Sequence, residues 1–166
     1  MLSLDVGCGD HKHGSIGVDR RRGTSADVVC DVHHLPFKDA CFDSVTSINV
    51  LEHSPNPLFF LKEQYRVLRP KGTVLAGTDN AQYYTWAVMQ PGHGGIRHED
   101  YDEEHVAIYY PKNVSRLLQH AGFKVTGWQP IYRNSKFDFL AKALVTLGAW
   151  RKECLFYRFQ VWGMKL

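Results

Sequence analysis

Cysteines, net charge and long apolar runs are all scarce in this sequence, and each scarcity excludes a class of protein. The 166 residues include four cysteines, and no two of them have the C-x-x-C spacing of a zinc or redox site. No apolar stretch approaches the roughly 20 residues that cross a bilayer. The formal net charge of +3 is far from the concentrated basic patch of a nucleic-acid-binding domain. We therefore expect a cytoplasmic protein with reduced thiols, with no membrane partner and with nucleic acid disfavoured as a partner.

The composition that remains is that of one globular domain. Hydrophobic residues make up 44% of the chain and charged residues 22%, an ordinary balance for a packed protein. Neither an internal repeat nor a linker is visible. We therefore treat residues 1–166 as a single domain.

Short apolar runs alternate with helical patterns along the chain. Apolar runs bounded by glycine and aspartate are typical of buried parallel strands, and apolar residues at three- and four-residue spacing indicate helices. This alternation predicts an α/β protein with a mostly parallel sheet. The strands are expected at 2–6, 15–19, 26–31, 43–51, 72–78, 123–132 and 155–164, and the helices at 58–68, 111–121 and 137–147.

A glycine turn and two aspartates follow the first three expected strands. Gly7 and Gly9 come directly after the first strand, and without a Cβ they let the backbone approach a ligand closely. Asp19 closes the second strand and Asp31 the third. Because the carboxyl ends of parallel strands share one edge of a sheet, these groups predict a nucleoside pocket at that edge.

Together these segments resemble the class I S-adenosylmethionine-dependent methyltransferases, in particular the type 11-like group that often acts on small molecules. The resemblance covers about residues 2–80, and no single motif in it is specific alone. The segments that carry it are Leu4–Asp10, Ile16–Asp19, Cys30–Phe37, Phe42–Val45 with Asn49–His53, and Arg66–Gly72.

The resemblance implies a doubly wound sheet of about seven strands with an antiparallel final strand. It also implies S-adenosylmethionine as cofactor and S-adenosylhomocysteine as product. Asp19 would hold the ribose, Asp31 and Val32 the adenine edge, and Asn49 and Val50 would lie under the sulfonium. The full set of expected cofactor-binding residues is Asp5, Gly7, Cys8, Gly9, Asp10, Asp19, Arg20, Asp31, Val32, Asn49 and Val50.

The chain departs from the family pattern in two places. Only ten positions separate Gly9 from Asp19, so a three-turn helix does not fit between the first two strands and we expect a loop or one turn. The chain also begins inside the first strand, whereas the family has helices ahead of it. The site is then either open or covered by a partner, a second copy, or residues 81–110, an aromatic-rich segment that we expect to act as a lid or substrate region.

Methyl transfer from a sulfonium mainly requires positioning, with a base for some acceptors. His53, at the tip of the fourth strand, is our first candidate for that base and His105 the second. The residues at the end of the fourth strand lack the Asp/Asn-Pro-Pro-Tyr/Phe pattern that is associated with methylation of amino groups on bases. This absence favours a small-molecule acceptor. We expect no metal, because His93, His98 and His105, with Glu103 and Glu104, have no tight ligand spacing.

Two other functions fit parts of the sequence. A shortened chain of this fold is also consistent with an inactive S-adenosylmethionine-binding or regulatory subunit. An NADP-dependent oxidoreductase fits less well, because the third glycine of its fingerprint is replaced by Lys12 and Asp19 comes too early.

Overall fold

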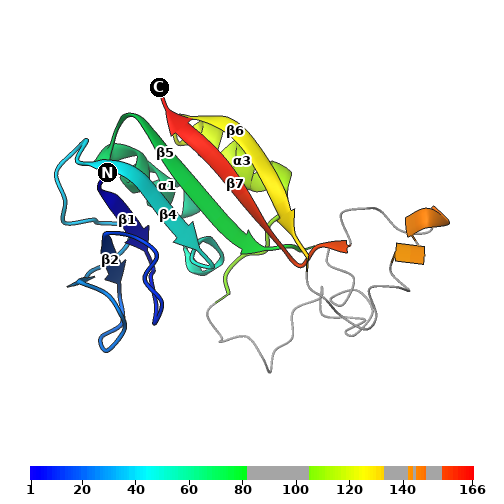
Figure 1. The fold of residues 1–166 in the computed structure, drawn as a ribbon, viewed down its shortest axis with the longest axis horizontal. Helices are drawn as coiled ribbons and strands as arrows, with labels where there is room; N and C mark the ends of the chain where they lie inside the picture. The colour runs from blue at the N-terminus through cyan, green and yellow to red at the C-terminus, as the bar shows by residue number, and fades with distance from the viewer. Residues whose placement is uncertain (82–104, 133–141, 144, 149–154) are drawn as a thin grey trace.

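A single seven-stranded sheet organises the described part of the chain (Figure 1). The computed structural model describes residues 1–81, 105–132, 142–143, 145–148 and 155–166. The sheet has the order β3-β2-β1-β4-β5-β7-β6. Its elements are β1 (Ser3–Val6), β2 (Ile16–Asp19), β3 (Val28–Val29), β4 (Phe42–Ile48), the short 3-10 helix η1 (Leu51–His53), α1 (Pro57–Val67), β5 (Leu68–Asp79), α3 (Pro111–His120), β6 (Phe123–Ile131) and β7 (Arg158–Lys165).

The strand order confirms the doubly wound arrangement. Strands β1 to β5 pair in parallel, and the chain winds outward from β1 first through β2 and β3 and then through β4 and β5. Strand β7 lies between β5 and β6 and is antiparallel to both. It is the expected antiparallel final strand. The winding reverses between β1 and β4, which is where doubly wound sheets bind ligands.

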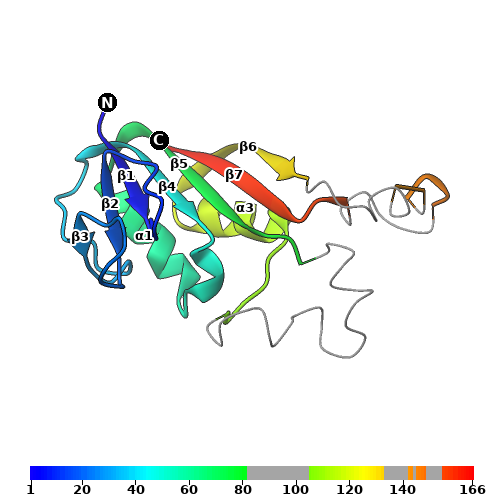
Figure 2. The same ribbon diagram turned by 60° about the horizontal axis from the view of Figure 1, so that its bottom comes forward.

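Both described helices form where the sequence predicts them. Asn56 caps α1 by accepting a hydrogen bond from the Phe59 backbone N–H at 3.1 Å, and Pro57 occupies its first position. Figures 1 and 2 show α1 and α3 on the same face of the sheet. Their buried side chains join the core that the strands form. Neither described helix has the length and hydropathy needed to cross a membrane.

No helix separates β1 from β2, as the short spacing predicts. The connection is held by side chains instead. A carboxylate oxygen of Asp5 accepts a hydrogen bond from the His13 backbone N–H at 2.6 Å. Lys12 Nζ lies 3.0 and 2.9 Å from the two carboxylate oxygens of Asp27, and Asp27 also accepts from the Gly17 N–H at 2.7 Å. These contacts replace the packing that a crossover helix would supply.

Two of the expected segments fall largely outside the described residues. Of the predicted lid, 81–110, the described part is Ala81 and residues 105–110. Of the helix predicted at 137–147, the described part is 142–143 and 145–147. Residues 142–143 and 145–146 are helical, in agreement with the predicted helix, whereas the lid and the rest of that helix remain predictions.

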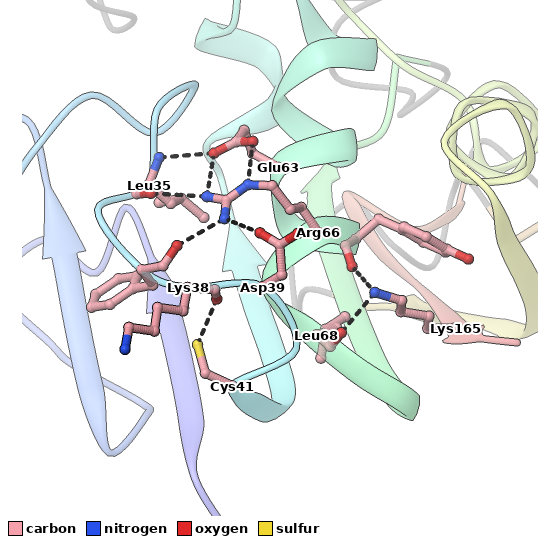
Figure 3. A network of polar contacts seen from close by, with 10 residues as sticks. Leu35, Lys38, Asp39, Cys41, Glu63, Arg66, Leu68 and Lys165 are labelled. Carbon is pink, nitrogen blue, oxygen red and sulfur yellow. Dashed lines mark hydrogen bonds and ion pairs between the residues drawn. The ribbon is translucent and has the colours of Figure 1, made fainter.

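Arg66 on α1 ties the helix to the segment that follows β3 (Figure 3). All five of its N–H donors are used. They reach both carboxylate oxygens of Glu63 at 2.8 and 2.9 Å, the carbonyl oxygens of Leu35 and Phe37 at 2.9 and 2.8 Å, and Asp39 at 2.7 Å. Glu63 in turn accepts from the Leu35 N–H at 3.0 Å. The network joins two of the motifs that carried the family resemblance.

Lys165, near the end of β7, binds carbonyl groups at the C-terminus of α1. Its Nζ donates to the carbonyl oxygens of Tyr65 and Leu68, each at 2.8 Å, and lies 4.5 Å from the centre of the Tyr65 ring (Figure 3). A cation at a helix C-terminus satisfies carbonyls that have no partner within the helix. The last strand is thereby fixed to the junction of α1 and β5.

Arg66→Lys should destabilise the fold because an ammonium cannot reproduce the planar five-donor arrangement. We expect a loss of about 1–3 kcal/mol in the free energy of unfolding, measured by urea denaturation, since the lost bonds involve charged partners. Arg69→Lys is the matched control, because Arg69 makes an exposed ion pair with Asp43 and should change stability by less than about 1 kcal/mol. Equal effects of the two substitutions would contradict the role assigned to Arg66.

Candidate active site

A cavity of about 760 Å³ lies at the carboxyl ends of β1 to β4. This volume falls within the roughly 300–1,000 Å³ of small-molecule sites. The cavity lies where the winding of the sheet reverses. Its lining residues are Gly7, Asp19, Arg20, Arg21, Val29, Cys30, Asp31, Val32, His33, Asn49, Val50, His53, Ser54 and Pro55.

Gly7 lets the turn after β1 lie against the turn after β4. Its φ is +71°, and a Cβ built on it would lie 2.3 Å from a methyl carbon of Val50. The N–H groups of Gly7 and Cys8 both donate to the Val18 carbonyl, at 2.8 and 3.0 Å. The turn after β1 is thus held against the ends of both neighbouring strands, β2 and β4. A side chain at position 7 would separate them.

The ionised carboxylate of Asp19 lies next to the turn that follows β1. It is 5% exposed and accepts hydrogen bonds from the Gly9 and Arg21 N–H groups, each at 2.9 Å, and from Arg21 Nε at 3.3 Å. Burial raises its pKa, but these hydrogen bonds and the guanidinium outweigh burial and leave the pKa below the ordinary value. A carboxylate has about four acceptor directions. One hydroxyl can therefore be accepted directly, and a second by displacing the long Arg21 Nε contact.

His33 joins the segment after β3 to the turn after η1. The Asp31 carboxylate accepts from the His33 N–H at 2.9 Å and lies 2.9 Å from His33 Nδ1. The other ring nitrogen lies 2.8 Å from the Ser54 hydroxyl. Hydrogen bonds from His33 keep the pKa of Asp31 below its usual value. A second ionised carboxylate therefore lies on the cavity wall.

Asn49 lines the cavity and has a buried side-chain acceptor. Its backbone adopts a φ of +56°, and its side-chain oxygen is buried with no hydrogen-bond partner among the described residues. Leaving such a group unsatisfied costs about 1–3 kcal/mol. A ligand that carries an N–H or O–H donor would remove this cost.

The structure brings together most, but not all, of the residues expected to bind a cofactor. Those that line the cavity are Gly7, Asp19, Arg20, Asp31, Val32, Asn49 and Val50, whereas Asp5, Cys8, Gly9 and Asp10 do not line it. Asp5 is buried beneath the turn and bonded to His13, and Gly9 acts through its N–H on Asp19. Asp5 and Gly9 therefore stabilise the turn and do not line the cavity.

Sequence reasoning missed Arg21, His33 and Ser54 as cavity residues. Arg21 belongs to a run of three arginines that alone indicates only a solvated turn. His33 and Ser54 meet across 21 positions of sequence. No local pattern predicts that contact.

The two histidines proposed as bases lie together, with Glu52 beside them. The ring centres of His53 and His105 are 4.3 Å apart with the planes at 66°. Glu52 is 2% exposed, and one carboxylate oxygen accepts from the Thr78 hydroxyl at 2.8 Å. Burial raises the pKa of Glu52 to about 7, against the opposing hydrogen bond from Thr78. Of these three residues His53 lines the cavity, so the cluster lies next to it.

A family comparison agrees with this geometry. The family described as "Methyltransferase domain" (Methyltransf_11) matches residues 4–76. Residues 4–76 belong to this methyltransferase family. They include β2 to β4, α1 and nearly all of β1 and β5, and thus every residue that lines the cavity.

Two similar curated proteins are methyltransferases by name and are longer than this chain. A human protein named probable tRNA methyltransferase 9B is 33% identical over 108 residues, a match that covers 54% of this chain and 22% of that protein. A probable S-adenosylmethionine-dependent methyltransferase of Mycolicibacterium smegmatis is 30% identical over 141 residues, covering 74% of this chain and 51% of that protein. The chain therefore spans about half or less of the length of these relatives.

A solved structure shows the same fold at low sequence identity. The S-adenosylmethionine-dependent methyltransferase of Thermotoga maritima, described as a possible histamine N-methyltransferase, superposes with a TM-score of 0.70 at 17% identity. The match covers 99% of this chain and 82% of the other. The fold of this chain is therefore the class I methyltransferase fold.

Gly7→Ala should disrupt the cavity, and Gly23→Ala is its matched control. Both glycines have positive φ, +71° and +82°, but nothing lies within 4 Å of a Cβ on Gly23. The control should lose only the backbone strain of about 1–2 kcal/mol, whereas Gly7→Ala should lose more because of the contact with Val50. Urea denaturation measures both. Adding Val50→Ala to Gly7→Ala should recover part of the loss, and equal losses for the two glycines would show that the close approach is unimportant.

Proposed function

We propose that this chain catalyses S-adenosylmethionine-dependent methyl transfer, with a small molecule as acceptor. The observation that carries the proposal is the cavity at the switch point, where the Gly7 turn and the ionised Asp19 and Asp31 meet within the residues of the methyltransferase family. These groups fit the chemistry of an adenosyl ligand, which offers hydroxyl and amine donors to acidic acceptors.

Three residues would hold the cofactor in this proposal. Asp19 would accept from the ribose hydroxyls, because its carboxylate is ionised and already oriented by Gly9 and Arg21. The buried oxygen of Asn49 would accept from a donor of the ligand. Gly7 would allow the backbone to approach the ligand.

The bound cofactor supplies a methyl group already activated by a positively charged sulfur. The protein's contribution is therefore mainly to align the acceptor and exclude water. Of the two histidines predicted as bases, His53 lines the cavity and His105 packs against it. The acceptor would bind beside His53, and the adenine beside Asp31 and Val32.

A tRNA acceptor is the second candidate, because the human relative is named a tRNA methyltransferase. Arg20 and Arg21 line the cavity and would be suited to a phosphate near the bound nucleotide. Against it, the tip reads Asn49-Val50-Leu51-Glu52 and lacks the pattern associated with amino groups of bases. Turnover with a panel of small hydroxyl and amine acceptors and with bulk tRNA separates the two candidates.

Asp19→Ala should weaken binding of S-adenosylhomocysteine, measured by calorimetry, by at least about tenfold, since it removes an ionised acceptor. Asp10→Ala is the matched control, because Asp10 is exposed and does not line the cavity. Circular dichroism checks that both variants fold. Unchanged affinity in Asp19→Ala would contradict the ribose assignment. Tight binding by the wild-type chain without turnover on any acceptor would instead favour the inactive binding subunit.

A further inference from the structure

We propose that Glu52, His53 and His105 form a binding site for one divalent transition-metal ion at the edge of the cavity. One donor atom from each residue lies within 4.8 Å of the other two. The residues come from η1 and from the segment that precedes α3. His105 is more than 50 positions from Glu52 and His53 in the sequence, so no local ligand spacing predicts this site.

Two donor atoms of the cluster are buried and have no hydrogen-bond partner among the described residues. They are Glu52 Oε1 and His53 Nδ1. Buried polar atoms are nearly always satisfied, and each exception calls for an explanation such as an ion. Glu52 is 2% exposed, so solvent does not reach its carboxylate. One cation between the two residues would satisfy both atoms.

The backbone holds the third ligand in place. The Val106 and Ala107 N–H groups donate to the Glu52 carbonyl at 2.9 and 3.3 Å. The same segment is fixed to the end of β5, because the Ala81 N–H donates to the Tyr109 carbonyl at 3.0 Å. His105 therefore lies beside His53 through main-chain bonds that do not depend on the side chains of the cluster.

Thr78 orients the carboxylate. Its hydroxyl donates to Glu52 Oε2 at 2.8 Å, which leaves Oε1 as the oxygen available to a cation. A hydrogen bond of this kind to a ligating carboxylate is typical of metal sites, where partners of the ligands fix their direction. We therefore assign Thr78 as a positioning residue.

The donor set selects the class of metal. One carboxylate and two imidazoles suit zinc or a neighbouring first-row divalent ion, whereas magnesium and calcium prefer oxygen ligands. With bonds of about 2.1 Å, two donors of one ion lie no more than about 4.2 Å apart. Any pair near the 4.8 Å limit would close by roughly half an ångström on binding. Three protein ligands also leave a position open for substrate.

The open position gives the metal a role that rests on the proposed methyl transfer. His53 lines the cavity, so a hydroxyl acceptor bound there could coordinate the ion and release its proton to water. Its oxygen would then form the new bond to the methyl carbon while the carbon–sulfur bond breaks and the electron pair stays on sulfur. The imidazole of His53 would serve as a ligand and not as the base.

The test is titration of the metal-free chain with Co²⁺ alone, followed by visible d–d absorption and calorimetry. We expect saturation at about one equivalent, and at least about tenfold weaker binding in Glu52→Gln and His105→Ala. His120→Ala is the matched control, because His120 is exposed on α3 and its loss should leave this affinity unchanged. Thermal denaturation adds a second readout, since Co²⁺ should raise the Tm of the wild-type chain but much less that of Glu52→Gln.

The outcomes separate this site from the proposed function. No saturable Co²⁺ binding, or equal affinity in wild type and Glu52→Gln, overturns the metal site. Saturable binding that both ligand variants weaken supports it, even where S-adenosylhomocysteine fails to bind and the methyl-transfer proposal falls. Turnover that persists in Glu52→Gln after it has lost Co²⁺ binding overturns the role of the metal in methyl transfer and leaves His53 as the base, while the loss of binding still supports the site.

Discussion

The contact between the Gly7 turn and Val50 is the constraint on which the cavity depends. A Cβ at position 7 would lie 2.3 Å from a methyl carbon of Val50, so glycine lets the turn after β1 pack closely against the Val50 side chain. The same turn bonds the Val18 carbonyl and, through the Gly9 N–H, the Asp19 carboxylate. One backbone geometry thus places three strand ends and orients the principal charged acceptor. The other residues that line the cavity, including Asp31 and His33, lie around this turn.

A loop replaces the usual crossover helix between β1 and β2, and this changes what its side chains do. A helix N-terminus would offer N–H donors and a partial positive charge to an anionic group. Here the backbone N–H groups of Gly9 and Arg21 are directed at the Asp19 carboxylate instead. Asp5 and Asp27 hold the loop by accepting the His13 and Gly17 N–H groups. These aspartates are therefore structural, which explains why an acidic residue at position 5 need not contact a ligand.

The strands, the two described helices and the edge that carries the cavity could be predicted because each depends on short-range patterns. Alternating apolar runs locate the strands, and the glycine turn marks their carboxyl ends. The contacts of individual side chains were less predictable. On α1, Phe60 and the polar Gln64 are fully buried, whereas the apolar Leu58 and Tyr65 are only partly buried. The role of Arg66, and the meeting of His105 with His53, join residues remote in sequence through bonds that no local pattern encodes.

Glu52 is the residue whose burial needs the most explanation. Ionised, its Oε1 is a buried acceptor without a donor, and protonated on that oxygen it is a buried donor without an acceptor, because no described residue bonds it. Neither protonation state removes the unsatisfied group, which costs about 1–3 kcal/mol. The neighbouring His53 Nδ1 is in the same position, and two such atoms from consecutive residues are rare by chance. A cation satisfies both at once, and it would stand at the edge of the cavity where the acceptor is proposed to bind.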